Sequence, residues 1–336
     1  MRAETLKSIF TILSIVTFCF CGQKTPCSMR ENTSTIVDLL LGEPVTLETA
    51  LDDMSQVRVV YVGEFHTIAR HHELQEEILR GLVQRNRNVS LAMEMFNSDQ
   101  QPVVDKWLST RESVSALAEN LGSDRWTNLL DYSGLLLKAR DFHIPVAALN
   151  ISSELVRKVS RGGLNSLSET ERSILPPNVE PINPDYARLL SLKLKVHRAF
   201  QGKTLDRVIY AQALRDAAMA SNIIRYLNGS ESKDGILMVI AGNGHLNYGL
   251  GVPERVKHGI DVTSRIILPS ESGELELSEA EKREAVDIEI SHEDLKFIRQ
   301  PIADYLSVIP IKSNDGDENG DSWNVAEKHQ DKERKQ

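Results

Sequence analysis

The stretch "VRVVYVGEFHTIARHHELQEEILRGLVQR", residues 57–85, decides the fold class. Its first part, "VRVVYV", is a nearly continuous run of β-branched and aromatic residues, which is typical of a strand buried on both faces. Farther along, Leu74, Ile78 and Leu82 recur at every fourth position, as in a helix with one apolar face. The stretch therefore predicts a buried strand followed by a helix, with the polar turn "GEFH" between them.

The same alternation of strand and helix continues along the chain. Buried strands are predicted at residues 89–95, 144–150, 235–242 and 262–269, and helical segments lie between them. This order predicts an α/β fold in which a parallel sheet is flanked by helices. Residues 151–200 hold several prolines and no evident strand, so they are expected to form a small inserted helical subdomain.

The N-terminus carries a different signal. Residues 9–21 form an apolar run behind basic residues, which is too short for a membrane span but suits a secretory signal. All three cysteines lie in or just after this run, and a bacterial lipoprotein signal explains them, because its cleavage leaves a lipidated cysteine at the new N-terminus. Cys21 is the predicted lipidated residue, with Cys19 as the alternative. An ordinary signal peptide or an uncleaved anchor is the other interpretation.

These observations divide the chain into four parts. They are a signal peptide of lipoprotein type at 1–21, a tether at 22–35, an α/β domain at 36–270 with its helical insert at about 151–200, and an acidic, partly disordered tail at 271–336. The composition is that of a globular protein, with 41% hydrophobic and 26% charged residues. The net charge of −9 and the lack of a basic patch argue against a nucleic-acid partner.

Polar side chains follow three of the predicted strands. Glu64 and His66 come after the first, Glu94 ends the second, and His245 follows a later one in a matching Gly-x-x-His turn. Ligands of open parallel sheets bind beyond the carboxyl ends of the strands, so these four side chains are expected to share one cleft. Imidazole and carboxylate groups bind zinc, manganese or iron. The four residues are therefore candidate ligands of a divalent metal ion, and Glu64 or Glu94 is the candidate catalytic base.

Each of these residues also has a structural alternative. Glu64 could cap the following helix or pair with Arg70, and the two histidines could be ordinary hydrogen-bonded polar groups. His71 and His72 fall in the first turn of the predicted helix, where a neutral surface role is expected. Glu94 is harder to explain in this way, because a carboxylate at the end of an apolar strand needs a partner.

An ordered set of motifs runs along residues 35–270, approximately. The motifs are "VGEFH", "HHELQEEIL", "LAMEMFNSDQQPVVDKWL", "PVAALN", "RGGLNSLS", "AQALRDAAMA" and "AGNGHLNYGLGVP". This set resembles the ChaN-like haem-binding uptake proteins, which share a superfamily with the Tiki and TraB proteins.

The resemblance implies an α/β domain with a small helical domain, lipoprotein status at the bacterial surface, and haem bound between the subunits of a dimer. It implies iron ligation by a tyrosine, for which Tyr186 and Tyr248 are the candidates. The leucines of the insert are then candidates for covering the porphyrin, although they could equally close the core of the insert. The expected partners are haem, the outer-membrane uptake machinery and the membrane, through the lipid anchor.

The wider superfamily implies a different activity. Its Tiki-type members resemble this chain in their paired Gly-x-x-His turns, which serve a metal-dependent peptidase. Gln212 and Asp216 are four residues apart on a predicted helix and could line the same cleft, although the acidic neighbour of Asp216 found in relatives is missing. The first hypothesis is thus a haem-binding lipoprotein in iron uptake. A metal-dependent hydrolase is the second, and a non-catalytic scaffold that binds partners is the third.

Overall fold

The computed structural model describes residues 35–86, 88–177, 179, 183–194, 202–229, 235–270 and 290–308. The predicted signal peptide, the lipidation site Cys21 and most of the predicted tether lie outside these residues. Most of the predicted tail also lies outside them. Within them, no helix is long and apolar enough to cross a membrane.

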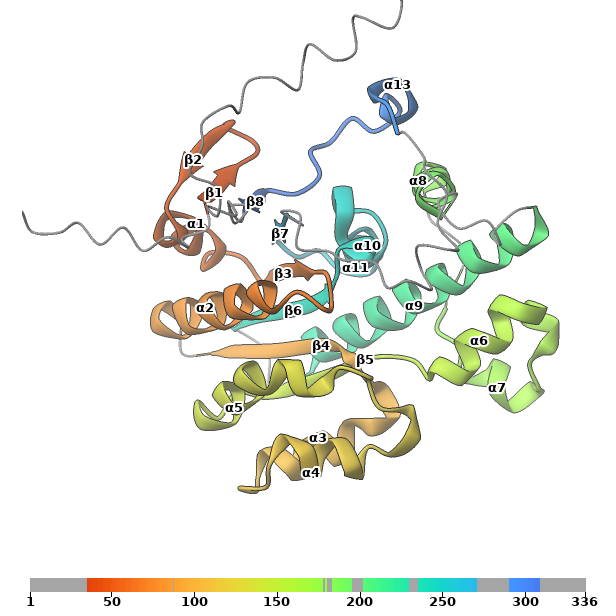
Figure 1. Cartoon of the computed structure of the whole chain (residues 1–336), viewed down its shortest axis with the longest axis horizontal. Helices are drawn as coiled ribbons and strands as arrows, with labels where there is room; N and C mark the ends of the chain where they lie inside the picture. The colour runs from red at the N-terminus through yellow and green to blue at the C-terminus, as the bar shows by residue number, and fades with distance from the viewer. Residues whose placement is uncertain are drawn as a thin grey trace, which may run out of the picture. The chain divides into compact units, whose positions relative to one another are not determined.

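The described chain is built on one eight-stranded sheet with the order β2-β1-β8-β7-β3-β6-β4-β5 (Figure 1). The six strands from β8 to β5 run parallel to their neighbours, and β1 and β2 add an antiparallel edge. The predicted α/β class with a parallel sheet is therefore confirmed. The strands are β1 (Thr35–Asp38), β2 (Glu43–Val45), β3 (Val59–Glu64), β4 (Val89–Asn97), β5 (Val146–Asn150), β6 (Ile236–Gly242), β7 (Ser264–Pro269) and β8 (Tyr305–Val308).

Helices cover both faces of the sheet, and the alternation of side chains along each strand assigns the faces. In β3, Val60 and Val62 pack into one core, whereas Val59 and Tyr61 pack into the other. The first face is covered by α1 (Leu47–Met54), α2 (Ala69–Arg85), α3 (Gln101–Leu108), α4 (Val114–Asn120) and α5 (Ser133–Asp141). The second face is covered by α9 (Lys203–Asn228), α10 (Asn243–Leu246) and α11 (Val252–Gly259).

Short 3-10 helices complete the connections at the strand ends. They are η1 (Ser98–Gln100), η2 (Gly122–Asp124), η3 (Leu129–Tyr132) and η6 (Asn247–Gly249). The predicted helix after β3 is α2, and its stripe of Leu74, Ile78 and Leu82 is buried in the core of the first face. Residues four positions apart lie on one face of a helix, so the burial of this face explains their spacing in the sequence.

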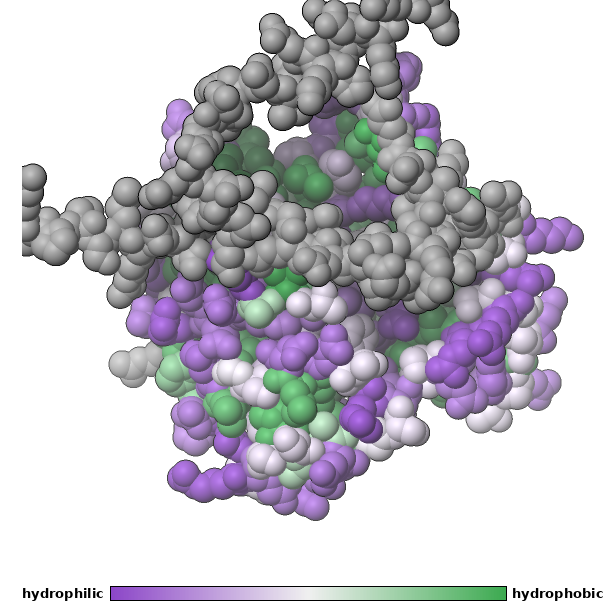
Figure 2. Space-filling model, in the orientation of Figure 1, coloured by the Kyte–Doolittle hydropathy of each residue, from purple (hydrophilic) through white to green (hydrophobic). Residues whose placement is uncertain are grey.

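The described part of the 151–200 insert is helical. It contains α6 (Ser153–Gly162), η4 (Leu164–Ser166), α7 (Glu169–Ser173) and α8 (Pro184–Leu194). The segment does not stand apart, because Leu155 and Val159 of α6 pack against Leu214 of α9. Figure 2 shows that the side chains over α6 and α7 are mostly hydrophilic on the face in view. The apolar side chains of α6 pack inside the molecule.

One predicted boundary is wrong. The tail was expected to begin at residue 271, but residues 290–308 return to the domain, with α13 (His292–Leu295) and the strand β8. β8 lies between β7 and β1 and pairs with both. No local pattern marks this strand, because "YLSV" is only four residues long and is too short to show a periodicity. Its position is fixed by main-chain hydrogen bonds and by Tyr305, whose hydroxyl donates to Asp53 Oδ2 at 2.8 Å.

Candidate functional site

Glu64, the last residue of β3, is the centre of the first half of the site. It is 1% exposed, and both of its carboxylate oxygens accept hydrogen bonds. The Tyr132 hydroxyl donates to Oε1 at 2.6 Å, and the Gln75 amide donates to Oε2 at 2.6 Å. These donors come from η3 and α2. Three elements therefore hold the carboxylate in one orientation.

The third partner of Glu64 is His66. Its Nδ1 lies 2.5 Å from Glu64 Oε1, so the carboxylate orients the imidazole ring and leaves Nε2 for other contacts. The Trp126 ring packs edge-on against it, with ring centroids 4.9 Å apart, and the His66 side chain keeps 34% of its surface exposed. Burial lowers the pKa of His66, but the hydrogen bond that its Nδ1–H donates to Glu64 and the charge of Glu94 outweigh burial and raise the pKa above its ordinary value.

Glu94 and His245 form the second half of the site, at the ends of β4 and β6. The main-chain N–H of Gly242 donates to Glu94 Oε2 at 2.8 Å, and His245 Nε2 lies 3.3 Å from Glu94 Oε1. Both side chains are buried. The sequence "GNGH" folds into the first turn of α10, which carries His245 back over the strand ends.

His245 lies between two carboxylates. Its Nδ1 is 2.5 Å from Asp216 Oδ1 of α9, and the hydroxyl of Tyr186 in α8 donates to the other oxygen of Asp216 at 2.5 Å. Burial lowers the pKa of His245, but Glu94 and Asp216 outweigh burial and raise the pKa to about 10. Burial likewise raises the pKa of Glu94, but the positive charge of His245 outweighs burial and holds that pKa well below its usual range. The ring is therefore a buried imidazolium at neutral pH.

The two halves meet at Gly242. A Cβ atom at this position would lie 3.0 Å from His66 Nε2, which is tighter than an ordinary contact, and 3.6 Å from Glu94 Oε2, so the glycine leaves room for the imidazole against the end of β6. We call Glu64, His66, Glu94 and His245 the strand-end cluster. Its members come together because β3, β6 and β4 are neighbours in the sheet.

The grouping does not by itself make a metal centre. Each carboxylate of the strand-end cluster is already hydrogen-bonded to its own histidine and to a further donor. Among the described residues, no group of three or more His, Cys, Asp or Glu side chains has an arrangement that could hold a metal ion. The arrangement is two orienting pairs, which suits proton transfer at His66 Nε2.

His71 and His72 were predicted to lie on the surface, and that prediction is wrong. His71 is 0% exposed and joins two segments, because its Nδ1 accepts from the Phe65 N–H at 2.9 Å and its Nε2 lies 3.1 Å from the carbonyl oxygen of Ser270. His72 is also buried, beside Tyr132, with ring centroids 4.4 Å apart. Burial lowers the pKa of His72 below 6.5. The first turn of α2 points inward at both positions.

The two candidate haem tyrosines have different surroundings. Tyr186 is 2% exposed and its hydroxyl is committed to Asp216. Tyr248 is half-buried, in η6, with a left-handed backbone at φ 62°. It packs against a cluster with Leu295, Phe297 and Ile298, and burial raises the pKa of its phenol. Of these two tyrosines, Tyr248 is the more accessible to a ligand.

Part of the site carried no sequence signal. Gln212 does contact the strand-end cluster, since its amide nitrogen lies 3.0 Å from His245 Nδ1. Its helix neighbour Asp216 contacts the same ring nitrogen. Tyr132 and Gln75 were not anticipated, although they hold Glu64. Tyr132 lies in a four-residue 3-10 helix, and Gln75 is a polar residue on an otherwise amphipathic helix, so neither position is marked by a motif.

Comparison with known proteins identifies the family. A family model described as "Haem-binding uptake, Tiki superfamily, ChaN" matches residues 50–256. The ChaN protein of Campylobacter jejuni, whose structure is described as showing cofacial heme binding, has a TM-score of 0.59 at 18% identity, over 84% of this chain and 98% of that chain. A mutant of the erythromycin esterase EreC in its open conformation gives a TM-score of only 0.42 at 14% identity, over 71% and 76% of the two chains.

A curated relative is known from a plant. The chain is 26% identical over 262 residues to the protein RETICULATA-RELATED 5, chloroplastic, of Arabidopsis thaliana, and the match covers 70% of this chain. It covers 35% of the relative, so the chain spans about a third of that protein's length. The family model matches more than half of the 336 residues. The chain therefore belongs to the haem-binding uptake family, ChaN, of the Tiki superfamily.

Proposed function

We propose that this protein binds haem and serves in haem or iron uptake. The match of the family model over residues 50–256 carries the proposal. Bound haem would supply a ferric iron, for which an anionic tyrosinate is a stabilising ligand. Haem held in this way would be a cargo that the protein carries.

Tyr248 is the proposed ligand. Its phenol is half-buried beside apolar side chains, whereas the Tyr186 hydroxyl is held by Asp216 in the interior. Phe297 lies in the same cluster and offers an aromatic face for a porphyrin. Arg188 lies 4.2 Å above the Phe297 ring and provides a cation for a propionate group. The residues present thus fit the chemistry of haem.

The insert leucines are less suited to covering the porphyrin. Leu189 and Leu190 belong to the same apolar cluster as Tyr248, but they are buried beside Tyr186 and Leu250 and so offer little free surface. Phe200, the aromatic residue at the end of the insert, lies outside the described residues.

Hemin titration tests this proposal. Wild-type protein should give a saturable spectrum with the charge-transfer band of high-spin ferric haem. Tyr248→Phe should lose that band, and Tyr186→Phe should keep it, because the buried phenol does not reach the haem. If both variants bind hemin as the wild type does, the tyrosine assignment is wrong. If the wild type binds hemin no more tightly than serum albumin does, the haem proposal itself is abandoned.

Membrane attachment through Cys21, exposure to the outer-membrane uptake machinery and dimerisation around haem belong to the same proposal. They rest on the sequence alone. Labelled palmitate should enter the wild type and be absent from Cys21→Ser. Label that persists in both Cys21→Ser and Cys19→Ser would contradict the lipid anchor.

A hydrolase is the second candidate, and the 2.5 Å contact between Glu64 and His66 favours it. In this mechanism His66 Nε2 takes a proton from water as its oxygen attacks a carbonyl carbon, and the same proton passes to the leaving group. Glu64 keeps the ring oriented, and the His245 imidazolium provides a fixed positive charge nearby. A divalent ion is an alternative source of that charge.

Ester hydrolysis tests the second candidate. Hydrolysis of p-nitrophenyl butyrate should be lost in His66→Gln and kept in His258→Gln, a matched exposed histidine on α11. The rate should rise as the pH passes the pKa of His66, because only neutral His66 accepts the proton, and Glu64 and Glu94 hold that pKa above its ordinary value. Chelation with EDTA distinguishes the mechanism that uses the His245 imidazolium from the one that uses a divalent ion. EDTA should lower the rate of hydrolysis only if a metal ion is required. Equal rates in wild type and His66→Gln would exclude the role of His66.

A further inference from the structure

The turn between β1 and β2 presents two leucine side chains to the solvent. Leu40 is 85% exposed and Leu41 is 65% exposed, which makes them the most exposed large apolar side chains of the described residues. Their neighbour Leu39 packs against the core of the second face, and its N–H donates to the carbonyl oxygen of Asp304 at 2.9 Å. We call residues 39–42 the leucine turn. Single exposed leucines are common on protein surfaces, whereas two adjacent ones on a fixed turn indicate a contact surface.

Asp38 fixes the conformation of the leucine turn. The N–H groups of Leu40 and Leu41 donate to Asp38 Oδ1 at 2.9 and 3.0 Å. The N–H of Gly42 donates to the carbonyl oxygen of Asp38 at 2.8 Å, and Gly42 adopts a left-handed backbone at φ 72°, which a glycine does without strain. The two exposed leucines are therefore held at the tip of a preformed turn.

The hydrogen bonds of the turn suit an apolar surrounding. Each N–H group from Leu39 to Gly42 has an acceptor within the molecule. The hydrocarbon region of a lipid bilayer offers no acceptors, so a segment can enter it only when its own chain satisfies its donors. A protein partner does not impose that condition, because it can supply carbonyl oxygens of its own. A stable dimer buries about 800 Å² on each partner, far more than two leucine side chains provide.

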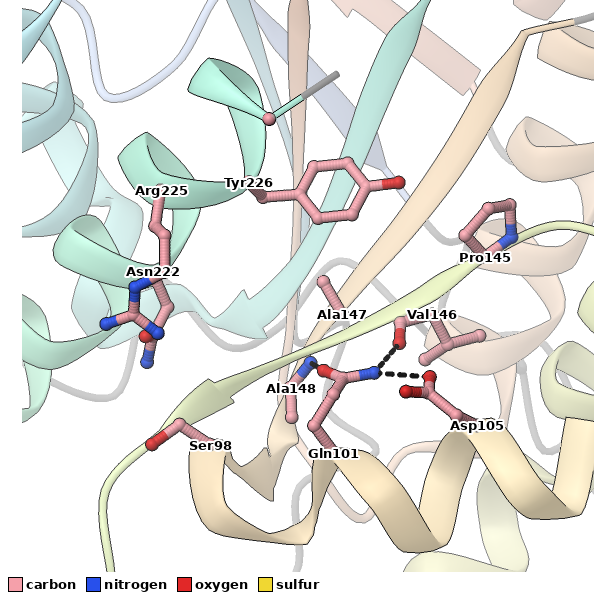
Figure 3. Close-up of a pocket in the computed structure, with 11 residues that line it drawn as sticks. Ser98, Gln101, Asp105, Pro145, Val146, Ala147, Ala148, Asn222, Arg225 and Tyr226 are labelled. Carbon is pink, nitrogen blue, oxygen red and sulfur yellow. Dashed lines mark hydrogen bonds between the residues drawn. The ribbon is translucent and has the colours of Figure 1, made fainter. Parts of the chain in front are cut away.

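The opposite edge of the sheet has a different character. β2 and β5 are the two edge strands (Figure 1). The cavity along β5 is lined by Asp105 of α3 and Arg225 of α9, and the Gln101 amide bonds to Val146 and Ala148 (Figure 3). Charged and amide groups of this kind cost free energy when they leave water. Of the two edges, the one with the leucine turn is suited to contact lipid.

The chain brings the leucine turn close to the predicted lipid anchor. β1 is the first described strand, and only residues 22–34 separate Cys21 from Thr35. An extended chain advances by at most about 3.6 Å per residue, so this connection spans at most about 50 Å. A lipid on Cys21 would therefore hold the turn within reach of the bilayer, at a high effective concentration. A second apolar contact strengthens attachment through an acyl chain.

We propose that the leucine turn inserts Leu40 and Leu41 into the outer part of a lipid bilayer whose headgroups carry no net charge. The proposal rests on the proposed anchoring of the chain through Cys21. The carboxylates of Asp38 and Glu43 flank the turn, and the net charge of the chain is −9. Anionic headgroups would repel these charges, so zwitterionic lipid is the preferred surface.

The strand directions give the orientation of the docked molecule. β1 is antiparallel to β8, whereas β8, β7 and β3 are parallel to one another. The leucine turn follows β1, so it points opposite to the carboxyl ends of the parallel strands. Docking through the turn would leave the strand-end cluster directed away from the lipid, where it can receive a ligand from water.

Quenching by brominated lipid tests the insertion. The acylated protein is reconstituted in phosphatidylcholine vesicles with or without dibromostearoyl chains, which quench indole rings inside the bilayer. Leu40→Trp should add a fluorescence component that the brominated chains quench, and the wild type with its three tryptophans gives the baseline. Ile174→Trp is the matched control, because Ile174 is an apolar residue of the insert with 63% exposure. Its added fluorescence should be unaffected.

Transfer between vesicles measures how much the two leucines contribute. The double variant Leu40→Ser/Leu41→Ser should leave donor vesicles about tenfold faster than the wild type, because two apolar side chains no longer hold it in the lipid. Ile174→Ser should transfer at the wild-type rate. All of these substitutions change exposed side chains, and circular dichroism checks that the variants are folded.

The anchor and the turn fail in different ways. Without palmitate on the wild type, the anchor falls, and this proposal falls with it. A palmitate-labelled protein that floats with vesicles while the Leu40→Trp component is not quenched overturns the proposal alone, as does equal quenching of the Ile174→Trp component. Stronger quenching in phosphatidylglycerol vesicles would contradict the preference for zwitterionic lipid. If the wild type dimerises in detergent and the double serine variant does not, the turn contacts a second copy and not lipid.

Discussion

A single buried histidine organises half of the strand-end cluster. His245 is hydrogen-bonded to Asp216 and lies against Glu94, and all three side chains are buried. Three charged groups in the interior are tolerated because the single positive charge faces both negative ones. Removal of the cation would leave two carboxylates in a medium that solvates them poorly.

We therefore expect His245→Asn to lower the free energy of unfolding by about 3–5 kcal/mol, as for a broken buried ion pair. Urea denaturation followed by circular dichroism measures the change. His258→Asn, at an exposed position in α11, is the matched control and should change stability by less than about 0.5 kcal/mol. A loss below 1 kcal/mol in His245→Asn would mean that the imidazolium is not the main partner of these carboxylates.

A second prediction concerns the protonation of His66. Its pKa is raised above 6.5 by Glu64 and Glu94 against the effect of burial, so Glu64→Gln should bring the value down. NMR titration of the ring protons measures both values. Tyr132→Phe keeps the Glu64 charge and serves as the comparison, and its effect should be smaller. An unchanged pKa in Glu64→Gln would contradict the hydrogen bond between Glu64 and His66.

At the residue scale, the sequence predicts those site residues that directly follow or end a predicted strand. Glu64, Glu94, His66 and His245 each follow a hydrophobic run, and parallel topology brings the ends of such runs together. Tyr132 and Gln75 could not be found in this way, because their contacts depend on how η3 and α2 pack. For the same reason, His71 and His72 were assigned to the surface, although the direction of the first turn of α2 buries both.

The elements of the sheet differ in how strongly the sequence marks them. β3, β4, β5, β6 and β7 are buried runs of five to nine residues and were predicted within a few positions. β1, β2 and β8 have three or four residues each, and their pairing depends on a contact between the two ends of the domain. No local pattern in the sequence encodes that contact.

The place of β8 predicts the effect of a truncation. A chain ending at residue 289 lacks β8, so β1 and β2 lose their connection to β7. Its unfolding free energy should fall by on the order of 5 kcal/mol, because several backbone hydrogen bonds of about 1 kcal/mol each are lost. Thermal denaturation measures the loss. A chain ending at 308 is the control and should match the full chain, whereas equal stability of both truncations would show that β8 contributes nothing.

The stability of the whole molecule should depend on pH through the strand-end cluster. The pKa of His245 is raised to about 10, so its contribution is complete below pH 6.5 and is lost as the pH rises through 10. The pKa of Glu94 is lowered, so its contribution is present above pH 4.5 and is lost as the pH falls through its folded value. The maximum from this pair therefore lies between pH 4.5 and 6.5.

Urea denaturation at a series of pH values checks this expectation. The unfolding free energy of the wild type should decline between pH 6.5 and 10. In His245→Asn the decline should be much shallower, because the group that titrates has been removed. A parallel decline in wild type and variant would assign the pH dependence to other groups.

The position of β8 also constrains how the protein is made. Translation delivers β1 and β2 first and β8 last, yet β8 is the strand that joins that hairpin to the rest of the sheet. Before β8 is made, the hairpin of β1 and β2 lacks its partner strand, and β7 has an unpaired edge. Both edges can pair with other proteins until β8 is available to join them. Of the described strands β8 is made last, so its arrival sets the time at which the new sheet becomes complete.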